Sequence, residues 1–550
     1  MPAQRFRRTL APVSLLAVFS LLLVPASASA AGTWAQRGET ILGAAAGDVF
    51  GTALDIDADG DTVVVGAPDN DDGGSDAGHV QILRFTAGSW VRLGAILEGA
   101  AASDYFGSAV SLSNDGNRVA VGAPYNGAGL EGQVQVFEYS AGSWTQLGAD
   151  IEEVSDGNGG WAVALSGDGT TLVMGSPFND DAGTDRGEVR VYRWNSGTTT
   201  WDRRGSIDLA GERNQDRFGY SVAIDNTGDM IAAGARDYDG PANDASASGH
   251  VRVYEFDTGT SQWVKRGGDI DGEAAGDRLG TTVSLDSTGD VVAIGAPKND
   301  VGGTATDAGH TVVYAWDSAT SDWVQRGSDI DGAAGDDSGT SVSLSANGNS
   351  VLVGSPGNNS DAGSANLYAW DGTVWSTTGP SPSGAAGDRA GAAIALSGDG
   401  NGLAVGLPEN DATASNAGAV VVFGYTLGVS EGVSVAGTPG IYLHVAGPVG
   451  RSAEGSPVYY GSDRVAHTST YLLSVRSAAG VTQHVLASGT VDVRGNLEAM
   501  VRLPALAPGR YDVVLTGQHL GGHGLSLSAE IRVNDQGRIG SLGANIPSIY

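Results

Sequence analysis

Hydrophobic and polar residues alternate in short runs along most of the chain, and the same pair of runs recurs. In the first run, apolar residues occupy every second position, as in Val110 and Leu112, whereas the second run is apolar almost throughout, as in Val63–Val65. Alternation of period two indicates a strand with one buried face, and a continuous apolar run indicates a strand covered on both faces. A turn such as Ser113–Gly116 lies between the runs, so the pattern predicts a β-hairpin.

This hairpin occurs seven times. Each copy begins near a Gly that follows a Phe or its replacement, and a second Gly lies 15 residues later in every copy. The first glycines are Gly51, Gly107, Gly160, Gly219, Gly280, Gly339 and Gly391, and the second are Gly66, Gly122, Gly175, Gly234, Gly295, Gly354 and Gly406. Every turn between the two runs also holds a Gly, from Gly60 to Gly400, which predicts a positive φ there.

Two more strands follow each hairpin. The third ends on an aromatic residue such as Phe85, and the fourth starts at a Trp such as Trp90, for which we expect a packing role. Four antiparallel strands per copy are typical of a propeller blade. An isolated fourth strand at Trp34 opens the repeats, and the last copy stops after its third strand at Tyr425. We therefore expect the first strand to complete the seventh blade and close the ring.

These repeats resemble FG-GAP repeats, the propeller units of the integrin α-subunit head that also occur in bacterial exported proteins. The matching strings are DVFG, DYFG and DRFG, then VGAP, MGSP and VGSP; the AGHVQIL and SGHVRVY segments fit the shorter bacterial variant. The resemblance covers residues 34–425 and implies an integrin α-like, seven-bladed β-propeller. By analogy with integrin heads, it also suggests cell adhesion or protein binding.

Many integrin hairpins of this type hold calcium in the pattern D-x-[DN]-x-D-G-x-x-D. The nearest match here is Asp55, Asp57 and Asp59, but Val63 stands at the position of the final ligand. We expect these short polar side chains to cap the hairpin turn. The alternative is a weak Ca²⁺ site at the three aspartates, and no other cofactor is expected.

The two ends of the chain differ from the repeats. Residues 1–30 combine three arginines, a short apolar run and an Ala28-Ser29-Ala30 site, which predicts a secretory signal peptide and a secreted, extracellular protein. Residues 31–428 form the predicted propeller. Residues 429–550 alternate polar and apolar residues and resemble immunoglobulin-like modules in LPALAPGRYDVVLTG. The expected fold is all-β: a seven-bladed β-propeller followed by a small immunoglobulin-like β-sandwich.

Composition narrows the possible partners. Gly makes up 86 of 550 residues, which excludes a helical bundle, and the absence of Cys excludes disulfides and thiol catalysis. The net charge is −33; residues 429–550 are neutral by count and residues 1–30 carry three arginines, so residues 31–428 carry −36. Such a charge repels nucleic acid and anionic lipid. We expect neither nucleic-acid binding nor membrane insertion, and we expect a monomer.

The connections from second to third strand, and from fourth strand to the next blade, are long and acidic and emerge on one side, here called the loop face. In six copies an Asn lies four residues after the second Gly, usually followed by Asp, and in six copies another Asp lies three residues before the first Gly. Repetition predicts turns in which side chains bond backbone N–H groups; the alternative is a ring of polar groups for cations or sugars. The candidate ligand-binding residues are Asp69, Asn70, Asp71, Asn126, Asn179, Asp180, Asn299, Asp300, Asn358, Asn410 and Asp411.

No catalytic motif is present: the chain has no G-x-S-x-G, no HExxH and no phosphate-binding loop. His79, His250 and His310 occupy the same position of the repeat, at the start of the third strand, here called the shared His slot. We expect packing or turn roles for them. The sequence predicts a non-catalytic, exported adhesion or binding protein whose loop face binds an extracellular protein or glycan. The alternatives are a lectin-like propeller and a secreted polysaccharide-acting enzyme, which would need acids, bases and aromatics unique to one blade.

Overall fold

The computed structural model describes residues 33–153, 156–240, 246–303 and 305–426, together with the backbone of strands between residues 441 and 549. Residues 33–426 form one compact unit, and residues 427–550 belong to another. The predicted signal peptide, residues 1–30, lies outside the described residues. Within the described ranges, no helix has the length and hydropathy needed to cross a membrane.

The first unit consists of seven antiparallel sheets, each built on four strands, around a common axis. The innermost strands are β3 (Ala53–Ile56), β8 (Ala109–Leu112), β13 (Ala162–Leu165), β18 (Phe218–Ile224), β23 (Thr282–Leu285), β28 (Ser341–Leu344) and β32 (Ile394–Leu396). The second strands are β4 (Thr62–Ala67), β9 (Arg118–Ala123), β14 (Thr171–Ser176), β19 (Met230–Ala235), β24 (Val291–Ala296), β29 (Ser350–Ser355) and β33 (Gly402–Leu407). These second strands are buried almost throughout, which explains why their sequences are apolar on both faces.

The outer strands complete each blade. The third strands are β5 (His79–Thr86), β10 (Gln133–Ser140), β15 (Glu188–Asn195), β20 (His250–Asp257), β25 (His310–Asp317), β30 (Ser364–Trp370) and β34 (Ala419–Thr426). The fourth strands are β6 (Ser89–Arg92), β11 (Ser143–Gln146), β16 (Thr200–Arg203), β21 (Gln262–Lys265), β26 (Asp322–Gln325), β31 (Trp375–Thr378) and β1 (Thr33–Gln36). Two-residue strands pair beside six of the third strands: β2 (Ile41–Leu42), β7 (Leu97–Glu98), β12 (Ile151–Glu152), β17 (Leu209–Ala210), β22 (Ile270–Asp271) and β27 (Ile330–Asp331). A four-residue helical segment, α1 (Asn358–Asp361), follows β29.

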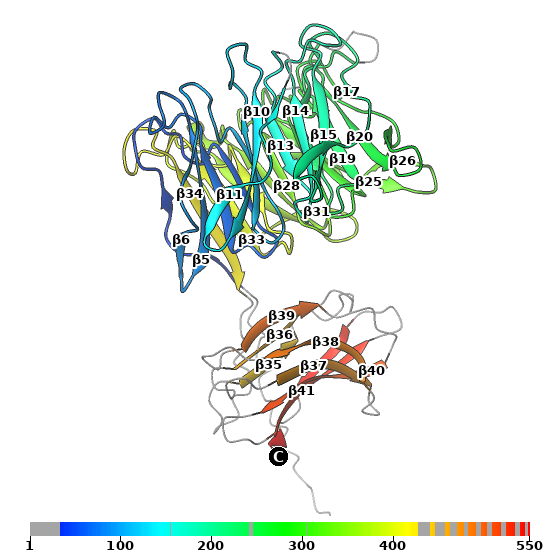
Figure 1. The fold of residues 1–550 in the computed structure, drawn as a ribbon. Coiled ribbons are helices and arrows are strands. Elements are labelled where there is room, and N and C mark those ends of the chain that lie inside the picture. The colour runs from blue at the N-terminus through cyan, green and yellow to red at the C-terminus, as the bar shows by residue number, and fades with distance from the viewer. Residues whose placement is uncertain are drawn as a thin grey trace, which may run out of the picture. The chain divides into compact units, whose positions relative to one another are not determined.

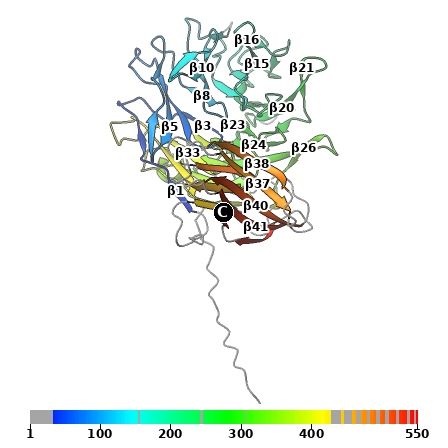
Figure 2. The same cartoon turned by 60° about the horizontal axis from the view of Figure 1, so that its bottom comes forward.

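The ring closes as the sequence predicts. Strand β1 pairs antiparallel with β34, with Trp34 opposite Tyr425, so the opening segment completes the seventh blade. Figure 2 shows the blades following one another around the axis, from β5 through β10, β15 and β20 to β33. The long connections between strands gather on the side that faces upward in Figure 1, which is the loop face. The seven-bladed propeller is thereby confirmed.

Glycine pairs set the distance between neighbouring blades. A Cβ added to Gly66 would lie 2.0 Å from the carbonyl oxygen of Gly107 in the next blade, far inside van der Waals contact. The same contact recurs around the whole ring and returns from Gly406 to Gly51, where the distance is 2.2 Å. The second Gly of one copy and the first Gly of the next are therefore required by contact between backbones.

Tryptophans join the outer parts of the blades. The indole N–H of Trp90 donates a hydrogen bond at 2.6 Å to the carbonyl oxygen of Arg37 in the preceding blade. Equivalent bonds of 2.7–2.8 Å are made by Trp144, Trp201, Trp263, Trp323 and Trp375. The guanidinium of Arg37 also stacks 4.4 Å from the ring of Phe85 and donates to the carbonyl of turn residue Gly60. These tryptophans pack blades together, as predicted.

The strands after residue 426 form two antiparallel sheets. One contains β35 (Ile441–Val445), β36 (Pro457–Ser462) and β39 (Leu497–Arg502). The other contains β37 (Thr470–Ser477), β38 (Thr482–Thr490), β40 (Gly509–Gln518), β41 (Gly524–Val533), β42 (Ile539–Ala544) and β43 (Ser548–Ile549). The all-β prediction holds for this backbone, and the immunoglobulin-like sandwich stays a prediction.

The glycine contact generates a direct test. We expect Gly66→Ala to lower the free energy of unfolding by about 3 kcal/mol or more, because the added methyl forces two blades apart. Gly268→Ala is the matched control, since a Cβ there meets only the Asp322 carboxylate, whose oxygens lie at 3.4 and 3.8 Å. Thermal unfolding followed by circular dichroism measures both. Equal melting temperatures for the two variants would contradict the role of the glycine contact.

Candidate functional site

The recurring Asn and Asp of the loop face bond to each other and to backbone. Asn299 Nδ2 donates to Asp277 at 3.1 Å, and Asn410 Nδ2 donates to Asp388 at 2.9 Å. The recurring Asp accepts the N–H of the residue three positions earlier in six blades, as Asp104 does from Ala101 at 2.9 Å. These two positions therefore tie the two loops of one blade together, which is the predicted turn geometry.

The candidate ligand residues differ in how accessible they are. Asn70, Asn179 and Asn299 are buried, whereas Asn126, Asn358 and Asn410 are half-buried. Several exposed aspartates brace their own loop by accepting a backbone N–H, namely Asp71, Asp180, Asp300 and Asp411. Asp69 is half-buried, and the pKa of its carboxyl is raised by burial and then by the nearby charges of Asp76, Asp71 and Asp48. Solvent reaches mainly the four bracing aspartates of this set.

The three aspartates of the candidate calcium site have separate partners. The two carboxylate oxygens of Asp55 accept N–H groups of Ile56 and, in the next blade, Leu112, both at 2.8 Å. Asp57 caps the hairpin turn by accepting the N–H groups of Asp61 at 2.8 Å and Thr62 at 3.0 Å. Asp59 is exposed. Among the described residues these carboxylates do not converge as a group of potential metal ligands, so the weak Ca²⁺ site stays a prediction.

The shared His slot serves packing in blade four. His250 is fully buried, and its ring centroid lies 4.1 Å from that of Tyr238. Burial, followed by the positive charge of Arg252, lowers the pKa of His250 to about 3. The imidazole is therefore neutral at physiological pH, consistent with the predicted packing role.

An aromatic cluster, here called the mouth cluster, lies where the inner strands of blades two to four begin on the loop face. It consists of Tyr105, Tyr125, Trp161, Phe178 and Tyr220, all half-buried. The Trp161 ring centroid lies 5.3 Å from that of Phe178 and 5.5 Å from that of Tyr220. The Tyr105 and Tyr125 centroids are 5.1 Å apart, and Tyr125 is 6.4 Å from Trp161. Five rings from three blades thus form one continuous patch.

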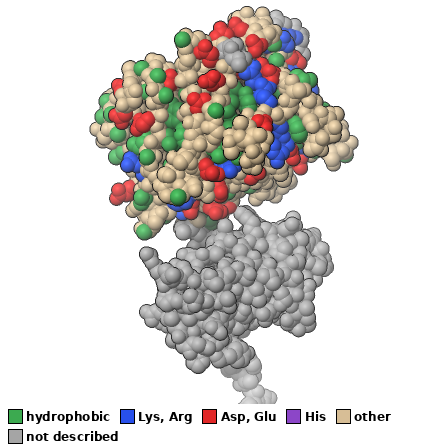
Figure 3. Space-filling model, viewed as in Figure 1, with side chains coloured by type: hydrophobic (Ala, Val, Ile, Leu, Met, Phe, Trp, Pro, Cys, Tyr) green, Lys and Arg blue, Asp and Glu red, His purple; other side chains and the backbone are tan. Residues whose placement is uncertain are grey.

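Arginines continue the mouth cluster into blade four. Asp237 is approached by Arg217 at 2.9 Å, Arg236 at 3.3 Å and Arg278 at 3.7 Å. The guanidinium of Arg236 also lies 4.0 Å from the ring centroid of Tyr220. Three guanidinium groups share one carboxylate, so this spot carries positive charge on an otherwise acidic propeller. Figure 3 shows basic side chains in a band over the region of β15 and β20, while acidic ones are spread across the visible face.

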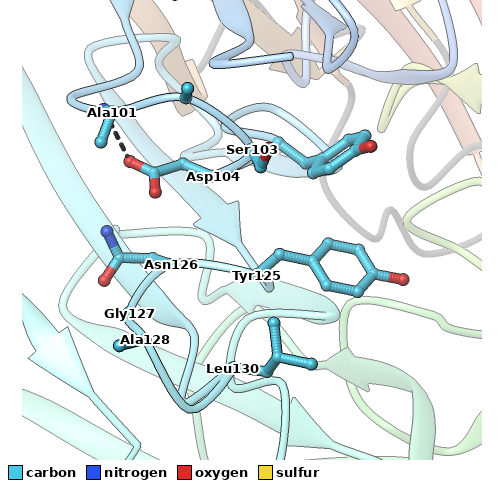
Figure 4. A pocket seen from close by; sticks show the side chains of 10 residues that line it. Ala101, Ser103, Asp104, Tyr125, Asn126, Gly127, Ala128 and Leu130 are labelled. Carbon is cyan, nitrogen blue, oxygen red and sulfur yellow. Dashed lines mark hydrogen bonds between the residues drawn. The ribbon is translucent and has the colours of Figure 1, made fainter. Parts of the chain in front are cut away.

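A cleft of about 780 Å³ opens beside the aromatic rings in blade two. Its walls are the loops at residues 101–105 and 125–130, and Tyr105 and Tyr125 of the mouth cluster line it. Figure 4 shows Asp104 and Asn126 on opposite walls, with Leu130 beside Tyr125. Leu130 is 47% exposed. Apolar and aromatic walls with a few polar groups are typical of ligand sites.

Sequence reasoning missed the mouth cluster. The residue after the first Gly is small in five copies (Thr52, Ser108, Thr281, Thr340 and Ala392) but is Trp161 or Tyr220 in the other two. That departure from the repeat was the available signal. A neighbouring position, two residues before the same Gly, has a positive φ of 48–58° in all seven blades: Val49, Tyr105, Asn158, Arg217, Arg278, Asp337 and Arg389. Because this strain is uniform, it belongs to the frame and does not mark one site.

Comparison with known proteins supports the repeat assignment. The family model described as FG-GAP repeat matches residues 42–83 and 96–137, so the chain carries FG-GAP repeats. No curated protein matches the chain. Among similar solved structures, a putative 6-phosphogluconolactonase from Bacteroides uniformis is 12% identical, with a TM-score of 0.44, and the match covers 62% of this chain and 88% of that one. The periplasmic gluconolactonase of Pseudomonas aeruginosa is 19% identical, with a TM-score of 0.41, covering 61% and 88%.

The buried carboxyl of Asp55 gives a pH-dependent prediction. Burial raises the pKa of Asp55 to about 6, although the Leu112 and Ile56 N–H groups oppose the shift. A raised pKa in the folded state means that the contribution of Asp55 to stability is complete below about pH 4 and is lost as pH rises through about 6. Asp55→Ser supplies the side chain that blades two, five and six carry at this position. We expect it to raise the melting temperature at pH 7.5 relative to the wild type, with little gain at pH 4.

Asp371→Ser is the control for that measurement. Asp371 is an exposed loop residue whose pKa is lowered by the N–H groups of Val374 and Thr373. A lowered pKa contributes stability above its ordinary value of 3.8 and loses it only below that pH, so Asp371→Ser should cost a similar amount at pH 4 and pH 7.5. A melting-temperature difference for Asp55→Ser that is the same at pH 4 and pH 7.5 would contradict the prediction.

Proposed function

We propose that this FG-GAP propeller is an exported, non-catalytic binding protein whose ligand is an acidic carbohydrate held at the mouth cluster. The observation that carries the proposal is the contact between the mouth cluster and the arginines around Asp237, made by Arg236 over Tyr220 and Arg217 over Phe178. A lectin-like propeller needs this combination of an aromatic platform and charged hydrogen-bond donors. The site lies on the loop face, as expected for a rigid scaffold that presents variable loops.

The aromatic rings supply the apolar part of the recognition. One face of a sugar ring carries mainly C–H groups, and it packs well against a flat aromatic side chain. Trp161 is half-buried and contacts Phe178 and Tyr220, so its ring is held in place before a ligand arrives. Such preorganisation lowers the entropic cost of binding. The cleft between residues 101–105 and 125–130 extends the surface for further sugar units.

The arginines favour a sugar that carries a carboxylate. A guanidinium binds a carboxylate through two parallel N–H bonds, and three of them share only Asp237. The overall charge of the propeller opposes an anion at long range. Yet screening at physiological salt acts over about 8 Å, so the arginines in contact with the ligand outweigh distant aspartates. Long, densely charged polyanions remain poor ligands, because they would extend over the aspartates of the propeller.

We also propose how the chain is exported, its oligomeric state and a role for residues 429–550. The chain leaves the cell through the signal peptide at residues 1–30, acts as a monomer and needs no cofactor for carbohydrate binding. Residues 429–550 form an immunoglobulin-like sandwich that serves as a spacer or attachment module.

A second candidate function is adhesion to a basic protein surface. The exposed aspartates of the loop face, such as Asp71, Asp180 and Asp411, favour it.

Binding of defined oligosaccharides tests the proposal. We expect hexuronate- or sialate-containing oligosaccharides to bind the full chain and to quench tryptophan fluorescence, whereas neutral counterparts bind more weakly. Trp161→Ala or Arg236→Ala should reduce affinity about 30-fold, as loss of a central contact residue does. Arg389→Ala is the matched control, because Arg389 lies on the same face and, among the described residues, forms an ion pair with Glu409 alone, at 3.6 Å.

Three outcomes would count against an acidic carbohydrate. Equal binding of neutral and acidic oligosaccharides would remove the role of the arginines. Equal losses from Trp161→Ala and Arg389→Ala would place the ligand elsewhere on the loop face. Binding of basic proteins, with no oligosaccharide bound, would favour adhesion through the exposed aspartates.

A further inference from the structure

Three potential metal ligands converge at the loop-face end of blade five, away from the mouth cluster. Glu273 lies between β22 and β23, His310 is the first residue of β25, and Asp329 directly precedes β27. Their ligand atoms all lie within 4.8 Å of one another. The three residues come from separate segments, so this convergence belongs to the folded blade.

Blade four holds the same acids around an arginine. The repeat places Glu212, His250 and Asp269 at the positions of Glu273, His310 and Asp329. There, Arg252 forms ion pairs with Glu212 and with Asp269, the latter at 3.1 Å. Two carboxylates converging on one point are thus neutralised by a guanidinium.

Blade three has the same arrangement of an arginine among carboxylates. Arg190 occupies the position of Arg252 and forms ion pairs with Glu153, Glu188 and Asp208, the last at 3.6 Å. Asp208 corresponds to Asp269 in blade four and to Asp329 in blade five. A cation therefore stands among the acids in both of these blades.

Blade five keeps the carboxylates and lacks the arginine. Val312 occupies the position of Arg190 and Arg252. Among the described residues, neither Glu273 nor Asp329 forms an ion pair, and Asp329 accepts only from Gln325 Nε2, at 2.5 Å. Two carboxylates that lie close together without a cation destabilise the folded state, because their negative charges repel each other.

His310 supplies a nitrogen ligand aimed at this group. The residue is 2% exposed, and a ring nitrogen lies within 4.8 Å of a carboxylate oxygen of Glu273 and of Asp329. The ring is therefore close to both carboxylates. Ligand atoms of a tetrahedral ion bound at about 2.1 Å lie about 3.4 Å apart, and these three groups, all within 4.8 Å of one another, reach that spacing by small side-chain movements.

We propose that Glu273, His310 and Asp329 bind a divalent transition-metal ion, with Zn²⁺ the best fit, which takes the place that arginine holds in blades three and four. An imidazole with two carboxylates suits zinc, whereas calcium prefers six to eight oxygen ligands. The ion links the connection that enters blade five to the third strand of that blade. Three protein ligands leave a fourth position for water or a ligand group.

Metal titration of the full chain tests the proposal. We expect Zn²⁺ to bind at one high-affinity site and to raise the melting temperature, and Co²⁺ at the same site to give a visible absorption band. His310→Gln and Asp329→Asn should each abolish the band and the stabilisation. Val312→Arg should do the same by supplying the cation that blades three and four contain.

His250→Gln is the matched control, because its slot in blade four already faces Arg252. It should bind Zn²⁺ as the wild type does. Loss of binding in His310→Gln separates this site from the five histidines in residues 429–550, which that variant retains. Circular dichroism verifies that each variant is folded. Absence of wild-type binding, or equal binding by the wild type, His310→Gln and Asp329→Asn, would overturn the proposal.

Discussion

The whole propeller depends on the contact between two backbones at each blade boundary. Gly66 faces the carbonyl of Gly107, and the same pair recurs until Gly406 faces Gly51. No side chain fits there, so neighbouring inner strands approach at a fixed distance. Hydrogen bonds then add to this frame: Leu112 donates to Asp55, and Leu165 donates to Ser111 across the next boundary. The constant 15-residue spacing in the sequence reflects this rigid part of each blade.

Because the frame is repeated, a functional site arises where a copy departs from it. Trp161 and Tyr220 replace small residues at the start of two inner strands, and they meet across a blade boundary. Val312 replaces an arginine in the third strand of blade five, and the surrounding acids lose their counter-charge. In both places a side chain that departs from the repeat alters the chemistry of a shared fold, which is how a single fold carries different sites.

The sequence predicted the features that one repeat encodes by itself. The hairpin, the positive φ of turn residues such as Gly60 and the closing pair of Trp34 and Tyr425 all follow from local pattern or from its interruption. The capping role of Asp57 also follows from its place in a turn. Convergence across blades could not be predicted in this way. The angle between blades decides whether Trp161 meets Tyr220, or Glu273 meets His310, and no spacing in the sequence records that angle.

The pairing of β1 with β34 has a consequence for how the molecule is made. The strand synthesised first is the partner of the strand synthesised last in the ring, so the circle cannot close until residue 426 is available. Until then β1 has no partner, and β33 is the open edge of the incomplete seventh blade. Closure is therefore a late event in the biogenesis of this protein, and a chain truncated before β34 lacks the partner of β1.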